Sequence, residues 1–128
     1  MNHSNETRVR EFWRCFDAAD FAAVRELMKP DAVIRWPNTR ERFHGSESFI
    51  QMNQSYPGRW RIRLEQLWSV ADQVISVAEV AAADGSASFY ATSFFRFEDG
   101  LIRELTEYYS ENAAPPPWRI AGGFAERY

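Results

Sequence analysis

Three turn signals in the second half of the chain constrain its fold more than any other feature. Two are the Asp-Gly pairs at residues 84–85 and 99–100, and the third is Ala71-Asp72. They separate runs rich in Val, Ile, Phe, Tyr and Trp, which are typical of β-strands. Asp-Gly pairs favour two-residue hairpins of type I′. The sequence therefore predicts an antiparallel meander of four strands, over residues 60–70, 73–83, 87–98 and 101–110.

The N-terminal residues follow the period of a helix. Val9, Phe12, Trp13 and Phe16 recur at the spacing i, i+3, i+4 and i+7, which predicts an amphipathic helix over residues 5–18. The apolar side of this helix needs a surface to cover, and a sheet offers one.

Two further helices and a strand are predicted before the meander. Asp20 is the expected N-cap of a helix over residues 21–28, which the dipeptide Lys29-Pro30 should end. A short strand is expected over residues 32–36, and Ser46 should cap a third helix that reaches about residue 55. The predicted fold is a single α+β domain over residues 1–128, with three helices on one face of a curved, mainly antiparallel sheet.

Charge and cysteine content exclude several classes of function. The net charge is −3, and the one basic cluster, Arg59, Arg61 and Arg63, is better explained as a solvated or interface face than as a phosphate contact, so no nucleic-acid partner is expected. The single cysteine, Cys15, rules out an intrachain disulfide and favours a reducing compartment. With no apolar run approaching membrane-spanning length, we expect a cytoplasmic protein without a membrane partner.

Extrapolating the hairpin registers brings two carboxylates together. If the registers continue without interruption, Glu107 lies opposite Thr92, Tyr109 lies opposite Tyr90, and Glu79 also lies opposite Tyr90. Glu107 and Glu79 would then share one largely apolar face. Burial among apolar neighbours raises the pKa of a carboxyl, which suits a general acid or base. We therefore expect Glu107 to be the catalytic residue with Glu79 tuning it; the alternative is a structural carboxylate that only accepts hydrogen bonds.

Aromatic residues make up 16% of the chain, which suits either a pocket lined with rings or simply an aromatic-rich core. If there is a pocket, we expect it to bind an apolar or aromatic metabolite. The seven candidate contact residues are Trp13, Trp36, Trp60, Trp68, Tyr90, Thr92 and Tyr109. No cofactor is expected, and the two histidines, His3 and His44, lack the further ligands that a metal site needs.

The opposite, convex face of the predicted sheet is also partly apolar. It should expose Phe89, Phe95, Phe97 and Tyr108, a patch that predicts a homodimer joined sheet to sheet. A stiff connector, Ala-Ala-Pro-Pro-Pro, then leads into an apolar C-terminal segment. We expect that segment either to fold over the mouth of the barrel or to dock on the partner.

Several of these segments together resemble a known superfamily. They are Val-Arg-Glu-Phe-Trp-Arg-Cys-Phe at 9–16, the second helix from Asp20, the helix opened by Gly45, and the hairpin over 95–109. The chain resembles the nuclear transport factor 2-like superfamily in its SnoaL-like branch. The resemblance implies a cone-shaped α+β barrel, a deep pocket and frequent dimers. The superfamily contains ketosteroid isomerases, scytalone dehydratases, limonene epoxide hydrolases, polyketide cyclases and non-enzymatic modules.

The resemblance also bears on the candidate site. Glu107 matches the position of a water-activating aspartate in limonene epoxide hydrolases, although Thr106 stands in place of their arginine and no arginine precedes Glu79. The dehydratases rely on pocket histidines, and in this chain only His44 could serve in that role. The chain is therefore expected to be a small-molecule-binding protein, an isomerase, cyclase or hydrolase with a carboxylate general acid or base. The alternative is a non-catalytic, dimeric binding or assembly module.

Overall fold

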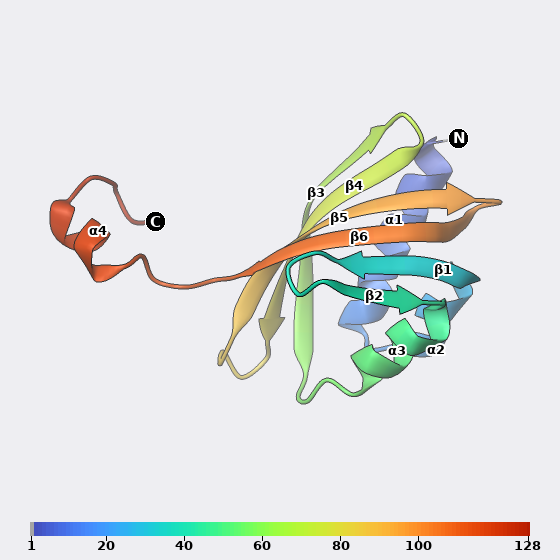
Figure 1. Cartoon of the computed structure of the whole chain (residues 1–128), viewed down its shortest axis with the longest axis horizontal. Coiled ribbons are helices and arrows are strands. Elements are labelled where there is room, and N and C mark those ends of the chain that lie inside the picture. The colour runs from blue at the N-terminus through green and yellow to red at the C-terminus, as the bar shows by residue number, and fades with distance from the viewer. Residues whose placement is uncertain (1) are drawn as a thin grey trace.

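The structure, a computed structural model, describes residues 2–128, with side chains from residue 5 onward, so the side chain of His3 lies outside the described residues. The elements in chain order are α1 (Asn2–Asp17), α2 (Phe21–Glu26), β1 (Met28–Trp36), β2 (Glu41–His44), α3 (Ser46–Gln54), β3 (Trp60–Val70), β4 (Gln73–Ala82), β5 (Ser88–Glu98), β6 (Leu101–Glu111) and α4 (Pro117–Gly122). The six strands form one curved sheet in the order β2-β1-β6-β5-β4-β3 (Figure 1).

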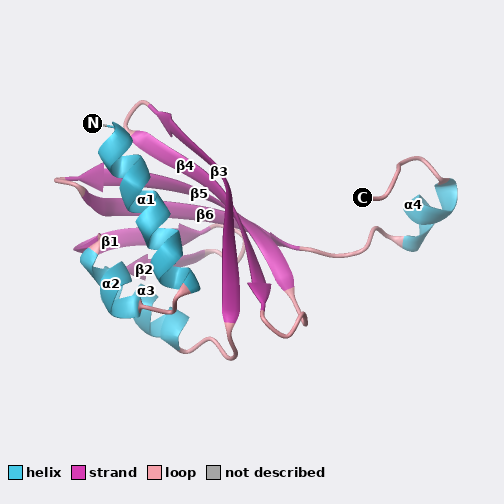
Figure 2. Cartoon of the chain, turned by 180° about the vertical axis from the view of Figure 1, so that it is seen from behind, coloured by secondary structure: helices cyan, strands magenta, loops and turns pink. Residues whose placement is uncertain are grey.

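Neighbouring strands of the sheet are antiparallel in every pairing but one. The strands β3 to β6 form the predicted meander, and β1 then pairs with β6 in parallel while β2 closes the edge against β1. The helices α1, α2 and α3 lie on one side of this sheet (Figure 2). The predicted α+β class, with a curved, mainly antiparallel sheet and three helices on its concave face, is confirmed.

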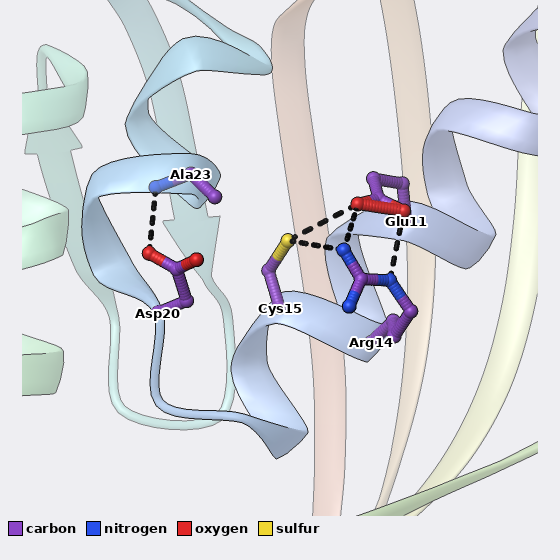
Figure 3. Close-up of polar contacts among 5 residues, drawn as sticks. All are labelled: Glu11, Arg14, Cys15, Asp20 and Ala23. Carbon is purple, nitrogen blue, oxygen red and sulfur yellow. Dashed lines mark hydrogen bonds and ion pairs between the residues drawn. The ribbon is translucent and has the colours of Figure 1, made fainter.

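The helix α1 covers the concave face with the apolar side that its sequence period predicts. Phe12 and Trp13 are buried, and the indole Nε1 of Trp13 donates a hydrogen bond to Ser76 Oγ on β4, at 3.0 Å. The next helix, α2, begins as predicted at Asp20, whose carboxylate accepts a hydrogen bond from the backbone N–H of Ala23 at 3.2 Å (Figure 3). The first of these hydrogen bonds joins α1 to the sheet, and the second caps the start of α2.

Some predicted boundaries were wrong. The strand β1 begins at Met28, so the second helix ends earlier than predicted, and Pro30 lies within a strand. The pairing of β1 with β6 is irregular between Met28 and Val33, and a proline is tolerated there because no ladder hydrogen bond requires its missing N–H. Gly45, not Ser46, caps α3, with φ at 95°, a backbone angle that glycine adopts readily. The short elements β2 and α4 were not predicted, and His44 lies in β2 rather than in a loop.

One β-bulge changes the face assignment of β6. The turn itself is as predicted: Glu98 pairs with Leu101, and Asp99 and Gly100 both have positive φ. Phe97 then pairs with Ile102 but Arg96 pairs with Glu104, so Arg103 is an extra, unpaired residue. Every later residue of β6 is displaced by one position from the predicted register. Glu107 therefore lies opposite Ser93, not Thr92.

A second bulge affects β3. Leu64 pairs with Ala78 and Gln66 with Val77, so Glu65 is the extra residue. Before this bulge Trp60 lies on the concave face, whereas after it Trp68 pairs with Ile75 and lies on the convex face. The predicted convex patch is also wrong: β4 and β5 pair in the predicted register, but the helices cover the opposite face from the one predicted. Phe89, Phe95 and Phe97 all lie on the concave side, where Phe95 is fully buried, and of the four residues only Tyr108 is on the convex face.

Among the described residues 2–128, no helix has both the length and the apolar character needed to cross a membrane.

Candidate functional site

A cavity of about 700 Å³ lies between the helices and the concave face of the sheet. Aromatic rings form most of its wall, and a few polar side chains interrupt them. The lining residues are Phe12, Trp13, Phe16, Trp36, Asn38, Phe49, Asn53, Tyr56, Trp60, Ile62, Val80, Ala87, Phe89, Ala91, Glu107, Tyr109, Ser110 and Glu111. Its size and its apolar wall are typical of sites for small organic molecules.

Glu107 is the most unusual residue of this cavity. Among the described side chains, those of residues 5–128, it is the only acidic or basic one that is buried, with 6% of its surface exposed. Its Oε1 accepts a hydrogen bond from Trp36 Nε1 at 3.0 Å, and its Oε2 accepts one from Ser93 Oγ at 2.8 Å. Both donors are neutral groups, so no cation offsets the charge of the carboxylate.

The strand order explains why these three side chains meet. Glu107 is on β6, which lies between β1 and β5. The parallel pairing of β1 with β6 matches Arg35 to Thr106, which brings the next residue of β1, Trp36, beside Glu107. On the other side, the antiparallel pairing places Ser93 of β5 directly opposite Glu107. The hydrogen bonds therefore come from rigid strands, which hold the carboxylate in one position.

Burial raises the pKa of the Glu107 carboxyl above its ordinary value of 4.5, because the charged form loses contact with water. The hydrogen bonds from Trp36 and Ser93 favour the carboxylate and oppose part of this rise in pKa. A carboxyl with a raised pKa exchanges a proton more easily near neutral pH than an ordinary glutamate does. The group is therefore suited to act as a general acid or base toward a molecule in the cavity.

Tyr109 lies two residues beyond Glu107, on the same side of β6. Its backbone N–H donates to Asn38 Oδ1 at 2.9 Å, and its hydroxyl is 3.4 Å from Thr39 Oγ1. The ring of Tyr109 packs edge-to-face on Trp36, with ring centroids 5.4 Å apart. The turn that joins β1 to β2 thus fixes Tyr109 at the cavity wall, where the phenol offers a hydrogen-bond donor.

Five of the nine predicted site residues line the cavity: Glu107, Trp13, Trp36, Trp60 and Tyr109. Two of the tryptophans have their indole N–H bound within the protein, Trp13 to Ser76 and Trp60 to the backbone carbonyl of Pro57 at 2.9 Å. The rings of these two residues therefore offer a bound molecule mainly apolar surface.

The other four predicted site residues, Glu79, Trp68, Tyr90 and Thr92, are not near the cavity, and their predicted placement was wrong. The bulge at Arg103 moved Glu107 to the face opposite that of Glu79, Tyr90 and Thr92, and the bulge at Glu65 put Trp68 on the convex face. Glu79 Oε1 accepts an ion-pair hydrogen bond from Arg63 Nη2 at 2.6 Å. It is not placed to tune the proton affinity of Glu107.

The sequence reasoning missed Ser93 and the aromatic residues Phe49 and Phe89 as parts of the site. A signal for Ser93 was present in β4 and β5. Alternate residues of these strands form an uncharged set of small and apolar residues that includes Ser76 and Ser93, whereas the other set contains charged residues such as Glu79. The uncharged set is the natural candidate for the buried face.

Other candidates for chemistry lie outside the cavity. Cys15 is buried, with its Sγ 3.6 Å from Glu11 Oε1 and 3.9 Å from Arg14 Nη2, and Arg14 forms an ion pair with Glu11 (Figure 3). Burial raises the pKa of the Cys15 thiol, which suits a small core residue rather than a nucleophile. Within residues 5–128, no group of three or more His, Cys, Asp or Glu side chains is arranged to hold a metal ion.

Comparison with a family model gives a match over most of the chain. The model is described as a SnoaL-like domain, and it matches residues 9–105. That range includes the bulge at Arg103 and ends shortly before Glu107. No curated protein matches the chain.

Solved structures share the fold at low sequence identity. A Kribbella flavida protein assigned as a ketosteroid isomerase is 22% identical, with a TM-score of 0.83 over 98% of this chain and 90% of that chain. An NTF2-like protein of unknown function from Burkholderia xenovorans is 19% identical, with a TM-score of 0.81 over 99% and 97%. The LEH-like epoxide hydrolase of M. tuberculosis is 15% identical, with a TM-score of 0.72 over 84% of each chain. At these identities the likeness shows the fold alone.

Proposed function

Because the chain belongs to the SnoaL-like domain family of the NTF2-like superfamily, we propose that it is a small-molecule-binding enzyme in which Glu107 transfers a proton as general base and general acid. One observation carries this proposal. A single buried carboxylate with a raised pKa lies in the wall of a large aromatic cavity, and its two oxygens are held by neutral donors.

The shape and the chemistry of the cavity favour a particular class of substrate. Its wall consists mostly of aromatic and aliphatic side chains, and no cationic residue lines it. An anionic substrate would therefore find no counter-ion, whereas a neutral, ring-containing molecule would bury its apolar surface. We expect an apolar or aromatic metabolite that carries a carbonyl group.

The proposed step is proton removal from carbon. Glu107, as the carboxylate, takes a proton from the carbon next to the carbonyl group, and the C–H electron pair moves into an enolate. When a carbon–carbon double bond of the substrate is conjugated with the enolate, the neutral carboxylic acid so formed returns the proton to the far carbon of that conjugated system. The carbonyl group re-forms, and the carbon–carbon double bond moves into conjugation with it. The hydroxyl of Tyr109, on the same wall, is the candidate donor to the enolate oxygen. This step is an isomerisation, and attack of the enolate on a second carbonyl of the substrate would make it a cyclisation.

Hydrolysis receives less support from the same residues. Activating a water molecule against an epoxide needs a second acid that protonates the oxygen of the opening ring. The other carboxylate on the cavity, Glu111, is exposed at its rim, while Glu79 is on the opposite face of the sheet.

A non-catalytic binding protein is the second candidate function, and one observation favours it. Both oxygens of Glu107 already accept a hydrogen bond from the protein, so the carboxyl has a structural explanation without any reaction. On this hypothesis the cavity binds a ligand and releases it unchanged.

Hydrogen exchange on carbon distinguishes the two functions without knowledge of the product. A panel of apolar cyclic ketones is incubated with the protein in D₂O, and deuterium uptake next to the carbonyl is measured by mass spectrometry. Binding is followed separately by quenching of tryptophan fluorescence. The enzyme hypothesis predicts exchange that Glu107→Gln abolishes while binding persists. Ligands that bind without any exchange would favour the binding protein, and exchange retained in Glu107→Gln would exclude the proposed role.

A further inference from the structure

We propose that the C-terminal arm, residues 112–128, docks on the convex sheet face of a second copy of this chain, so that two copies exchange arms. The arm leaves the body at the end of β6, and α4 lies away from the rest of the chain in both views (Figures 1 and 2). This inference does not depend on any role of Glu107.

The arm presents apolar side chains to solvent. Trp118 is 68% exposed, Ile120 is 51% exposed and Phe124 is 77% exposed. None of the six residues of α4, all of which the structure describes, is buried. Isolated helices of this length are unstable in water, because nucleation costs more than so few hydrogen bonds return. The arm therefore needs an apolar surface against which α4 can pack.

The connector before α4 keeps the arm from turning back on its own body. Pro115 and Pro116 precede Pro117, the first residue of the helix. Each ring fixes φ, and each following proline holds the preceding residue in an extended conformation. Pro116 has φ −58° and ψ 148°, which are the angles of a polyproline II helix. A stiff, extended connector directs α4 away from the chain that carries it and toward another molecule.

The convex face offers a surface of matching character. We call the residues Trp68, Val70, Tyr90, Phe94 and Tyr108 the convex patch. Trp68 and Tyr108 are each about half exposed, and the Tyr108 ring packs edge-to-face on Phe94 with centroids 5.9 Å apart. A hollow of about 240 Å³ opens on this face, lined by Gln73, Phe94, Arg96, Glu104, Thr106 and Tyr108. Exposed aromatic clusters of this kind mark interaction surfaces.

A second copy of the chain is the partner that covers both surfaces. Every copy carries one arm and one convex patch, so a two-fold pair buries two arms and two patches at once. The alignment with the Kribbella flavida and Burkholderia xenovorans structures covers 98% and 99% of the chain. Because the arm comprises the last 17 of the 128 residues, that coverage includes most of it. The alignment with both crystal structures therefore extends into the arm.

The oligomeric state of full-length variants tests the exchange. The arm variant is Trp118→Ala with Phe124→Ala, and the face variant is Tyr108→Asp. Light scattering after gel filtration and sedimentation equilibrium should show a wild-type dimer, and each variant should raise its dissociation constant by at least about 30-fold, as loss of an aromatic anchor does. Tyr56→Ala removes an exposed aromatic ring away from both surfaces and should leave the dimer unchanged. Circular dichroism and thermal unfolding check that every variant is folded.

Mixing the two variants gives the sharper result. The arm variant keeps an intact patch and the face variant keeps an intact arm, so their heterodimer contains one complete arm–patch contact while each homodimer contains none. We expect the mixture, followed by energy transfer between labelled chains, to associate more tightly than either variant alone. A monomeric wild type, an arm variant that dimerises like the wild type, or a mixture without heterodimers would each overturn the proposal.

Discussion

Glu107 and Glu79 are both glutamates of one sheet, but their surroundings on its two faces differ. Glu107 faces the concave side, is 6% exposed and has Trp36 and Ser93 as its hydrogen-bond donors. Glu79 faces the convex side and is paired with Arg63 at 2.6 Å. Only one strand, β5, separates the strands that carry them.

The difference lies in what balances the negative charge. The Glu79 carboxylate has the guanidinium of Arg63 beside it as a counter-ion. A buried carboxylate with neutral donors has no such partner, and burial raises the pKa of Glu107 instead. The concave face thus carries a buried carboxyl without a counter-ion, and the convex face carries one that is paired with an arginine. Four experiments test this difference between the two faces.

The largest expected difference is in catalysis. Replacing Glu107 with Gln should lower kcat/KM for proton transfer by about 10²- to 10⁴-fold, the usual contribution of a general acid or base. Glu79→Gln, the matched change on the other face, should alter kcat/KM by no more than about twofold. Rates of deuterium uptake by a substrate from the ketone panel measure both. Equal losses in the two variants would show that the faces do not differ in this way.

Adjacent phenylalanines on β5 provide the test of packing. Phe95 is fully buried, and its ring lies edge-to-face on Phe12 at a centroid distance of 5.2 Å, whereas Phe94 is on the convex face. Phe95→Ala should reduce the free energy of unfolding by about 3–5 kcal/mol, because it leaves a cavity in the core. Phe94→Ala should cost about 1 kcal/mol. Urea unfolding measures both values, and a larger loss for Phe94→Ala would reverse the assignment of the core.

The pH dependence of stability tests the raised pKa of Glu107. Because its folded-state pKa lies above the ordinary value of 4.5, the folded chain binds this proton more tightly than the unfolded chain does. The stability that this tighter proton binding contributes is fully present below pH 4.5 and is lost as the pH rises through the folded-state pKa of Glu107. Glu107→Gln removes that loss. The free energy of unfolding of the Glu107→Gln variant, relative to that of the wild type, should therefore increase with pH above 4.5. The full increase should be about 1.4 kcal/mol for each unit by which folding raises the pKa of Glu107.

Unfolding curves of both proteins between about pH 4 and pH 8 measure this difference. A difference that is constant over this range would mean that the pKa of Glu107 is not raised by folding.

The smallest expected effect concerns the donor at Ser93. Ser93→Ala removes a hydrogen bond that favours the carboxylate, so the pKa of Glu107 should rise further. The loss of free energy of unfolding should be about 1 kcal/mol. Thr92→Val changes the neighbouring residue on the convex face and should leave the pKa of Glu107 unaltered. Carbon-13 NMR titration of the Glu107 carboxyl reports the pKa, and a shift with Thr92→Val instead would contradict the observed register.

Local signals were sufficient to predict most of the fold. The turns at Ala71-Asp72 and Asp99-Gly100 make the strand pairings predicted for them, and Asp99 and Gly100 have the positive φ angles of a type I′ turn. The apolar period of residues 9–16 matches the buried side of α1. Each of these features depends on residues that are close together in the sequence. The SnoaL-like family and the α+β class were predicted correctly for this reason, because the order of such elements leaves few possible architectures.

The candidate site was harder to predict, because it depends on long-range register. Glu107 was found from its chemical context alone, but its partner was misassigned to Glu79 since nothing near Arg103 in the sequence marks an extra residue. The extra residue contacts another strand. Arg103 forms an ion pair with Asp31 at 2.7 Å, in the stretch of β1 where pairing with β6 is itself irregular. A contact between residues so far apart in the chain has no local signature.

The bulge at Arg103 also has a consequence for the evolution and engineering of such proteins. A single-residue deletion at this position, with the turn intact, would bring Tyr108 to the cavity and turn Glu107 toward solvent, although the composition of the strand would hardly change. One extra residue in the hairpin thus determines which face of the sheet Glu107 occupies. When homologues of this chain are aligned, a gap of one residue here should be weighted as heavily as the loss of the carboxylate itself.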